Sequence, residues 1–271
     1  MSDVQYKQDG AIALITLDAP ERMNSYNVAM HHALHDAIVK ADTDNSVRVI
    51  VVTGAGRAFC AGADISQGFA AAGFAEEAPK LDGIDRDYGG MLNLRIFECD
   101  TPIIAAVNGV AVGIGATMLL PMDIKIVSSK AKFAFPFTRR GIVYDGAASW
   151  FLPRIVGFSR AQEWGLTGRI ILPEEAKSAG MIHEIVEPDA VLDRAMELAR
   201  DMAVNVAPES AAQNKRLMRE SLLGGGEYGG GPMRSHMKES EILSRHFVSE
   251  DCIEGVTAFL QKRPPKFNDR K

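Results

Sequence analysis

Cysteine is scarce in this 271-residue sequence: Cys60, Cys99 and Cys252 are odd in number and far apart. This usage gives neither a disulfide framework nor a zinc-ligand spacing, so we expect reduced thiols in a cytoplasmic protein. Long hydrophobic runs are also absent, and the N-terminus MSDVQYKQDG has no apolar signal region. We therefore expect no membrane span and no secretory leader. Positive charge is not in excess, since the formal net charge is −5 and no basic stripe occurs, which argues against nucleic-acid binding.

The chain does carry apolar residues, at 46% of the sequence, enough for one large domain or a domain with an extension. Strand and helix patterns alternate at first and only helices follow, which predicts an α/β core over residues 1–188 and a helical region over 189–271. The predicted strands are Val4–Lys7, Ala11–Leu17, Val47–Thr53, Ile103–Val107, Asp123–Val127, Lys132–Phe135 and Met181–Val186. The predicted helices are Val28–Ala41, Met91–Phe97, Ala116–Leu120, Gly146–Ile155, Ala190–Val206, Glu209–Leu223 and roughly Pro232–Lys262. Residues 66–86 have weak periodicity and are predicted to be a mobile loop or lid, and Gly224–Gly231 a joint.

The stretch Ile103–Ile124 combines a buried strand, a glycine loop with Gly113 and Gly115, and a helix start. Unpaired N–H groups at such a place can hold an anion or a developing oxyanion. The dinucleotide fingerprint G-x-G-x-x-G fails, because its sixth position from Gly113 is Met118. On spacing alone, a plain buried turn between strand and helix is slightly favoured over a binding site.

Three histidines, His31, His32 and His35, lie on the polar side of the helix predicted at 28–41. His31 and His35 are one turn apart and could share a metal ion. However, the glutamate of an H-E-x-x-H site is missing and no third ligand is evident. We expect a solvated helix face and no metal site.

Two stretches together are specific for a family. Ala58–Ile65, AFCAGADI, and Ala106–Gly115, AVNGVAVGIG, resemble the signature of the crotonase family, the enoyl-CoA hydratases and isomerases. The resemblance covers nearly the whole chain and includes RMNS at Arg22–Ser25, RGIV at Arg140–Val143, the segment Trp150–Gly157, and GVTAFLQK at Gly255–Lys262. It implies a spiral of ββα turns, a C-terminal helical region that builds a homotrimer or a dimer of trimers, and an acyl thioester of coenzyme A as substrate. No cofactor is implied beyond the CoA that is part of that substrate.

The resemblance also implies roles for individual residues. Backbone N–H groups of Ala63 and Ile114 would bind the thioester oxygen, where negative charge develops during α-proton removal or addition to the enoyl group. Ile114 replaces the usual glycine, which keeps the N–H but narrows the pocket. The CoA groove would contain Arg22, Met23, Ala61, Asp64 and Ile65. An apolar acyl pocket is suggested by Phe135, Phe137, Ile114 and Trp150. Phe259 and Lys262 would reach the nucleotide end from the next subunit, although Lys262 alone would be taken for a solvated charge at a helix end.

The family's hydratases use two glutamates, and this sequence has neither: their positions hold Thr117 and Phe137. Asp145 remains, where some isomerases of the family keep their single base. Aspartate is also a preferred N-cap, so Asp145 could simply begin the helix predicted at 146–155. Aromatic acyl-CoA dehalogenases use a nucleophilic aspartate there, but their histidine position is Gly90. Tyr144 could assist, while Arg139 and Arg140 suit the surface or CoA better than catalysis.

The sequence therefore predicts an enzyme that acts on an acyl-CoA, with Asp145 as the single acid–base group, because moving a double bond needs only one base. A hydratase with a non-standard site, a non-catalytic acyl-CoA-binding scaffold and, less favoured, a dehalogenase-like hydrolase are the alternatives.

Overall fold

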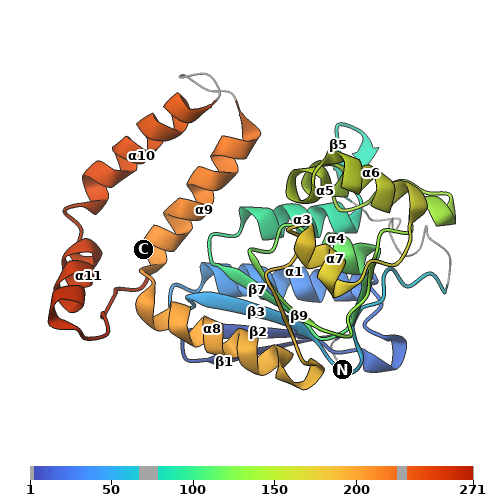
Figure 1. Cartoon of the computed structure of the whole chain (residues 1–271), viewed down its shortest axis with the longest axis horizontal. Coiled ribbons are helices and arrows are strands. Elements are labelled where there is room, and N and C mark those ends of the chain that lie inside the picture. Colours follow the sequence, from blue (N-terminus) through green and yellow to red (C-terminus); the bar gives the residue numbers. More distant parts are fainter. Residues whose placement is uncertain (1–2, 67–78, 225–230, 271) are drawn as a thin grey trace.

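We describe the fold from a computed structural model, which covers residues 3–66, 79–224 and 231–270 (Figure 1). Its large sheet has the strand order β1-β2-β3-β7-β9-β11, in which β1 is antiparallel to β2 and all other pairs are parallel. The strands are β1 (Val4–Asp9), β2 (Ile12–Leu17), β3 (Val49–Gly54), β7 (Ile103–Val107), β9 (Ile124–Ser128) and β11 (Glu184–Val186). This confirms the predicted α/β class.

A second, small sheet has the order β10-β8-β4 and is parallel throughout. Its strands are β4 (Ala58–Cys60), β8 (Val110–Val112) and β10 (Phe133–Ala134). Each turn of the chain adds one strand to the large sheet and the next to the small sheet: β3 then β4, β7 then β8, β9 then β10. Helices α3 (Tyr88–Glu98), α4 (Ile114–Thr117) and α5 (Ala148–Val156) follow the three pairs, which confirms the expected spiral of ββα turns.

The strands of the large sheet are apolar on both faces, because both faces are covered. In β3, Ile50 and Val52 face the larger core between the two sheets, where α1 (Val28–Thr43) and α3 also pack. Val49 and Val51 face the opposite side and pack under α8 (Val191–Asn205) (Figure 1). Helix α8 therefore covers the sheet, although it belongs to the predicted helical region. The boundary at residue 189 stays a prediction.

Several elements differ from the sequence-based expectations. The sequence missed β4, β8, α6 (Phe158–Thr167) and α7 (Pro173–Ser178). Helix α3 begins at Tyr88, three residues earlier than expected. The described part of the expected lid contains a short hairpin, β5 (Lys80–Leu81) with β6 (Ile84–Asp85). Residues 67–78 of the lid and 225–230 of the glycine joint lie outside the described residues.

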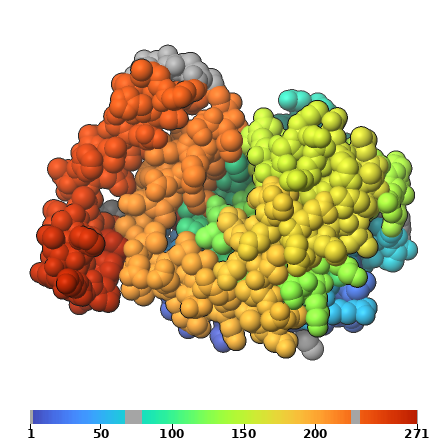
Figure 2. All heavy atoms as spheres, viewed as in Figure 1, coloured from blue at the N-terminus to red at the C-terminus, as the bar shows by residue number. Residues whose placement is uncertain are grey.

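The helices α9 (Pro208–Leu223), α10 (Pro232–His246) and α11 (Glu250–Gln261) form an arm beside the body (Figures 1 and 2). The single helix expected over 232–262 is thus wrong. Helix α10 ends at His246, and the Ser249 side chain accepts a hydrogen bond from the N–H of Cys252 at the start of α11. This is N-capping by serine.

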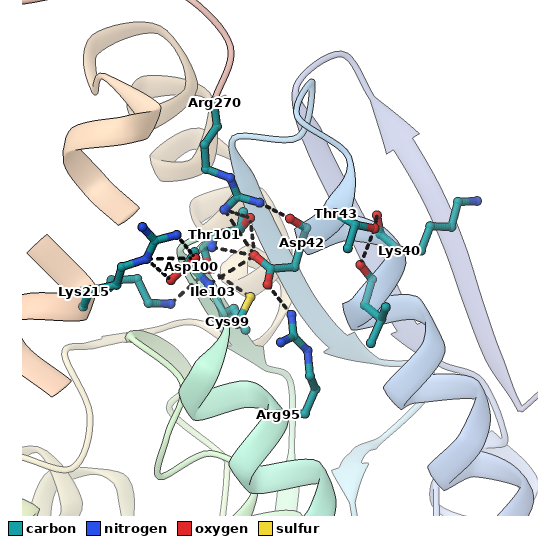
Figure 3. Close-up of polar contacts among 12 residues, drawn as sticks. Lys40, Asp42, Thr43, Arg95, Cys99, Asp100, Thr101, Ile103, Lys215 and Arg270 are labelled. Atoms are coloured by element: carbon teal, nitrogen blue, oxygen red, sulfur yellow. Dashed lines mark hydrogen bonds and ion pairs between the residues drawn. The ribbon is translucent and has the colours of Figure 1, made fainter. Parts of the chain in front are cut away.

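After α11 the chain returns to the body, where Arg270 binds the end of α1 (Figure 3). The buried Asp42 carboxylate accepts hydrogen bonds from the Thr101 N–H and hydroxyl, both at 2.9 Å, and pairs with Arg95 and Arg270. These bonds and cations hold the pKa of Asp42 well below its usual range despite its burial. The tail is therefore anchored to the body by a buried ionic cluster.

Candidate active site

The candidate site begins where two parallel strands of the small sheet end side by side. Strands β4 and β8 pair Ala58 with Val110 and Cys60 with Ala111. Ala63 follows the first strand and Ile114 the second. Glycine is required at this junction: a Cβ on Gly115 would lie 2.1 Å from the carbonyl oxygen of Cys60. The carboxyl ends of both strands therefore bring Ala63 and Ile114 to one edge of the sheet.

The backbone N–H groups of Ala63 and Ile114 have no acceptor among the residues that the structure describes. Ile114 is the first residue of α4, where an N–H has no intrahelical partner. Ala63 pairs with Tyr26 in an isolated parallel bridge whose hydrogen bonds use Gly62 and Asp64 instead. Both residues line the same pocket. Two free donors at one pocket wall are what an oxyanion site needs.

The pocket has a volume of about 560 Å³ and a largely apolar wall. Its lining includes six of the predicted site residues: Ala61, Ala63, Ile65, Ile114, Phe137 and Asp145. Ile114 is buried and points its Cδ1 toward Gly89, where a Cβ would approach it to 2.7 Å. The larger side chain at position 114 is thus accommodated by a glycine on α3.

Asp145 lies at the pocket wall in the segment before α5. The hydroxyl of Thr117 donates to its Oδ1 at 2.8 Å. Burial, with a smaller contribution from Asp87, raises the pKa of Asp145 to about 7, although the Thr117 bond opposes the shift. Both protonation states are therefore accessible near neutral pH.

The alternative role of Asp145 as a helix cap is wrong. Helix α5 starts at Ala148, its cap residue is Ala147 in the left-handed region at φ 54°, and no side chain caps it. Only the backbone carbonyl of Asp145 takes part, accepting from the Ala148 N–H at 3.0 Å. The Asp145 carboxyl is thus not used by the helix. The two positions that hold glutamate in the hydratases, Thr117 and Phe137, are buried, and Phe137 lines the pocket.

Asp87 is a pocket residue that sequence reasoning missed. It caps α3, because its Oδ1 accepts from the N–H of Gly90 at 2.5 Å. The same oxygen lies 3.4 Å from the N–H of Gly146, next to Asp145. The available signal was an aspartate three residues before a glycine at the start of a helical pattern, but the predicted helix began too late to include it.

A second missed residue is Tyr26, which lines the pocket and is 2% exposed. Its hydroxyl lies 2.7 Å from Nδ1 of His31, and His31 is buried rather than solvated, so the expectation for that histidine is wrong. Burial, with His32 and His35 nearby, lowers the pKa of His31 to about 4. Among the described residues, no group of three or more His, Cys, Asp or Glu could hold a metal ion.

The predicted groove residues lie beside the pocket. The Ala61 N–H donates to the carbonyl of Met23 at 3.1 Å, which joins the segment after β4 to the turn at Arg22–Met23. Arg22 pairs with Asp3 at 2.5 Å and lies 4.0 Å from Asp64. Arg22, Met23 and Asp64 do not line the pocket itself, whereas Ile65 does and is 46% exposed.

The remaining candidates divide into pocket and non-pocket residues. Arg140 and Tyr144 line the pocket, although the Tyr144 hydroxyl donates to the Ala161 carbonyl at 3.2 Å. Phe135 stacks on Trp164 in the core, and Trp150 packs on Phe97 outside the pocket lining. Phe259, 81% exposed, and Lys262 lie at the end of α11 on the arm, away from this pocket. Their role in a neighbouring subunit stays a prediction.

Comparison with known proteins agrees with this geometry. The model of the enoyl-CoA hydratase/isomerase family matches residues 7–270. An enoyl-CoA hydratase of Alternaria alternata is 40% identical over 259 residues, which cover 95% of this chain and 83% of that protein. The 1,2-epoxyphenylacetyl-CoA isomerase of Escherichia coli is 33% identical over 267 residues, 96% of this chain and 95% of that protein. A crystal structure of an enoyl-CoA hydratase from Mycobacterium tuberculosis superimposes with a TM-score of 0.84 at 30% identity, covering 99% of each chain.

The chain belongs to the enoyl-CoA hydratase/isomerase family, the crotonase superfamily, and is an enzyme of that family that acts on an acyl-CoA. Among the described residues, no helix is both long and apolar enough to cross a membrane.

Proposed function

We propose that this enzyme moves a proton at the carbon next to a CoA thioester, with Asp145 as the acid–base group and the N–H groups of Ala63 and Ile114 as oxyanion donors. The observation that carries the proposal is that the Asp145 carboxyl lines the same pocket as the two free N–H groups. Its pKa, raised to about 7 by burial, suits a group that must take up and release a proton at neutral pH.

The reaction favoured by this arrangement is the shift of a double bond along the acyl chain. Ionised Asp145 takes a proton from C2 of a β,γ-enoyl thioester, and the electron pair moves toward the thioester oxygen. The two N–H groups stabilise that enolate because they are fixed before charge develops. Asp145 then returns the proton to C4, which leaves the α,β-enoyl thioester. One relative with 33% identity is named as a 1,2-epoxyphenylacetyl-CoA isomerase, so isomerisation of an acyl-CoA, although of an epoxide, occurs among the relatives.

We assign the CoA groove to Arg22, Met23, Ala61, Asp64 and Ile65, with Phe259 and Lys262 supplied by a neighbouring subunit of a homotrimer or a dimer of trimers. Support comes from the arm, where large apolar side chains are exposed on all three helices: Met218, Leu222, Leu223, Met233, Met237, Leu243, Ile253, Val256, Phe259 and Leu260. An apolar surface of this extent is typical of an interface. No cofactor is needed, because CoA arrives with the substrate. A cytoplasmic location is proposed from the three free cysteines.

The dehalogenase alternative loses support at Gly90. A Cβ at this position would lie 2.6 Å from Asp87 Oδ2, so a histidine there would require the Asp87 side chain to move. The scaffold alternative requires that no acyl-CoA is turned over, which the following experiment tests directly.

The test replaces Asp145 by asparagine and follows deuterium uptake from heavy water at the α carbon of a saturated acyl-CoA, together with isomerisation of a β,γ-enoyl-CoA. Asparagine keeps the acceptor for Thr117 but cannot take a proton, so both rates should fall by roughly 10²–10⁴-fold. Asp36→Asn, at an exposed position on α1, is the matched control. Equal rates in Asp145→Asn and parent would refute the assignment, and absence of turnover in the parent with intact binding would favour the scaffold.

A further inference from the structure

Asp87 presents a second carboxylate to the pocket, and its two oxygens have different surroundings. Oδ1 accepts from the N–H of Gly90 at 2.5 Å and lies 3.4 Å from that of Gly146. Oδ2 has no hydrogen-bond partner among the residues that the structure describes. A carboxylate with one oxygen fixed by backbone and the other free is oriented yet available to a small molecule.

The first turn of α3 has glycines beside this carboxylate. Two consecutive glycines, Gly89 and Gly90, follow Asp87 and Tyr88, and a Cβ at either position would crowd the carboxylate at 3.2 Å or 2.6 Å. With glycine at both places, the first turn of α3 leaves the carboxylate its present position. The same two glycines leave room for Ile114 on one side and for the Asp87 carboxylate on the other.

Asp87 and Asp145 come from loops 58 residues apart in sequence and meet at the pocket through the contact of Asp87 Oδ1 with Gly146. We propose that Asp87 is a second catalytic residue, the base that activates a water molecule for addition to an α,β-enoyl-CoA, with Asp145 as the matching acid. This inference rests on the proposed function, since it uses the same Asp145 and the same oxyanion donors.

The proposed step conserves atoms and charge. Ionised Asp87 takes one proton from water as the water oxygen bonds to C3 of the enoyl group. The electron pair of the C2–C3 double bond moves to the thioester oxygen, where the N–H groups of Ala63 and Ile114 hold it. Protonated Asp145 then gives its proton to C2, so that one water has been added. Asp87 ends protonated and Asp145 ionised, and exchange with solvent restores both.

The charge of Asp87 favours the protonated form of Asp145, which is the form that the proposed step requires. Ionised Asp87 disfavours a second negative charge at Asp145 and so contributes to raising its pKa. Among the described residues, the other titratable or charged groups near Asp145 are Tyr26 and Cys60, both buried, and Tyr144 and Arg140, which line the same pocket. Burial raises the pKa of the Tyr26 hydroxyl and brings that of the Cys60 thiol to about 12, so both are neutral near pH 7.

The experiment compares Asp87→Asn, Asp87→Ser and Asp145→Asn with the parent enzyme. Asparagine and serine cap helices about as well as aspartate, so α3 should be retained, as circular dichroism would verify. Asp82→Asn, at the exposed turn of the β5–β6 hairpin, is the control for loss of one negative charge. Two rates are measured: hydration of a trans-2-enoyl-CoA, and α-deuterium uptake into a saturated acyl-CoA.

Both Asp87 variants should lower hydration by roughly 10²–10⁴-fold while changing α-deuterium uptake far less, because uptake needs only Asp145 and the oxyanion donors. The Asp145 variant should lower both rates. In addition, the pH midpoint of α-deuterium uptake should move down in Asp87→Asn, since a like charge has been removed. This shift depends only on the charge of Asp87, so a purely capping role is recognised instead by hydration and α-deuterium uptake that change equally.

Parental hydration in a folded Asp87→Asn enzyme would overturn the role of Asp87 and leave that of Asp145 intact. Hydration that is absent in the parent as well, with α-deuterium uptake present, would also overturn it. Parental α-deuterium uptake in Asp145→Asn would instead overturn the proposed function.

Discussion

Because the pKa of Asp145 is raised in the folded enzyme, burying this carboxyl lowers the free energy of unfolding by an amount that depends on pH. The pKa is raised from 3.8 to about 7 by burial. Between these values the folded protein holds a proton that the unfolded chain has lost, so the free energy of unfolding falls as pH rises. Below 3.8 both states are protonated and the cost vanishes, and above 7 it is constant at its largest value.

Replacing Asp145 by asparagine removes this pH-dependent cost and keeps the acceptor for the Thr117 hydroxyl. From the two pKa values, the cost is about 4 kcal/mol at pH 8 and about 2 kcal/mol at pH 5. The variant should therefore gain between about 2 and 3 kcal/mol over the parent when pH is raised from 5 to 8. Effects of the amide that do not depend on pH cancel in this difference.

The measurement is urea unfolding of both proteins at pH 5, 6, 7 and 8, at one protein concentration because the stability of an oligomer depends on concentration. Thr117→Val gives a second perturbation: it removes the one side-chain hydrogen bond that favours ionised Asp145, so the fall in stability with pH should extend to higher pH. A difference between Asp145→Asn and parent that is flat from pH 5 to 8 would refute the assigned pKa and with it the acid–base argument.

Two further predictions concern the oxyanion donor at Ile114 and the CoA contact of Lys262. Ile114→Pro removes one oxyanion N–H at the first position of α4, where proline is tolerated, and should raise the activation barrier by roughly 2.7–4 kcal/mol. Ile114→Gly keeps the N–H and should admit larger acyl groups. Full activity in a folded Ile114→Pro enzyme would contradict the donor role. Lys262→Glu should weaken CoA-thioester binding at low salt, because it reverses a charge near phosphates, without changing the urea midpoint. Calorimetry would measure the affinity, and light scattering would test for the trimer that this contact requires. An unchanged affinity or a monomer would remove Lys262 from the site.

The two glycine-containing loops that carry Ala63 and Ile114 could be recognised in the sequence because they depend on close backbone approaches that only glycine permits, whereas the oxyanion role of the two N–H groups came from the resemblance and stays a prediction. A Cβ on Gly109 would lie 2.1 Å from the carbonyl oxygen of Arg57, and the Asn108 side chain ties the same loop to Gly54 and Gly56. Such requirements leave a local motif that can be recognised. The short strands β4 and β8, with three residues each, were missed because that length is too small for a periodic pattern.

Asp87 and Tyr26 could not be placed from sequence, because their roles depend on contacts between distant segments. Tyr26 lies in a segment without periodicity, and its burial comes from the packing of His31 and Tyr88 around it. His31 was expected to be solvated because it lies on the polar side of a predicted helix, yet its side chain is buried against Tyr26 and Tyr88. The single helix expected at 232–262 failed for the opposite reason, since a local serine cap interrupts a continuous helical pattern.

The two carboxylates and the two proposed oxyanion donors come from different parts of the fold, so one set can vary in sequence independently of the other. Ala63 and Ile114 are set by the ends of β4 and β8, whereas Asp87 and Asp145 belong to the loops before α3 and α5. The proposed acid–base groups can therefore change without disturbing the proposed donors, and Thr117 and Phe137 replace the glutamates expected from the resemblance while the pocket is retained. In the mechanism that we propose, the donors would supply the enolate chemistry and the two loops would determine which proton moves. Asp87→Asn therefore tests the role of the loops more directly than any comparison of folds.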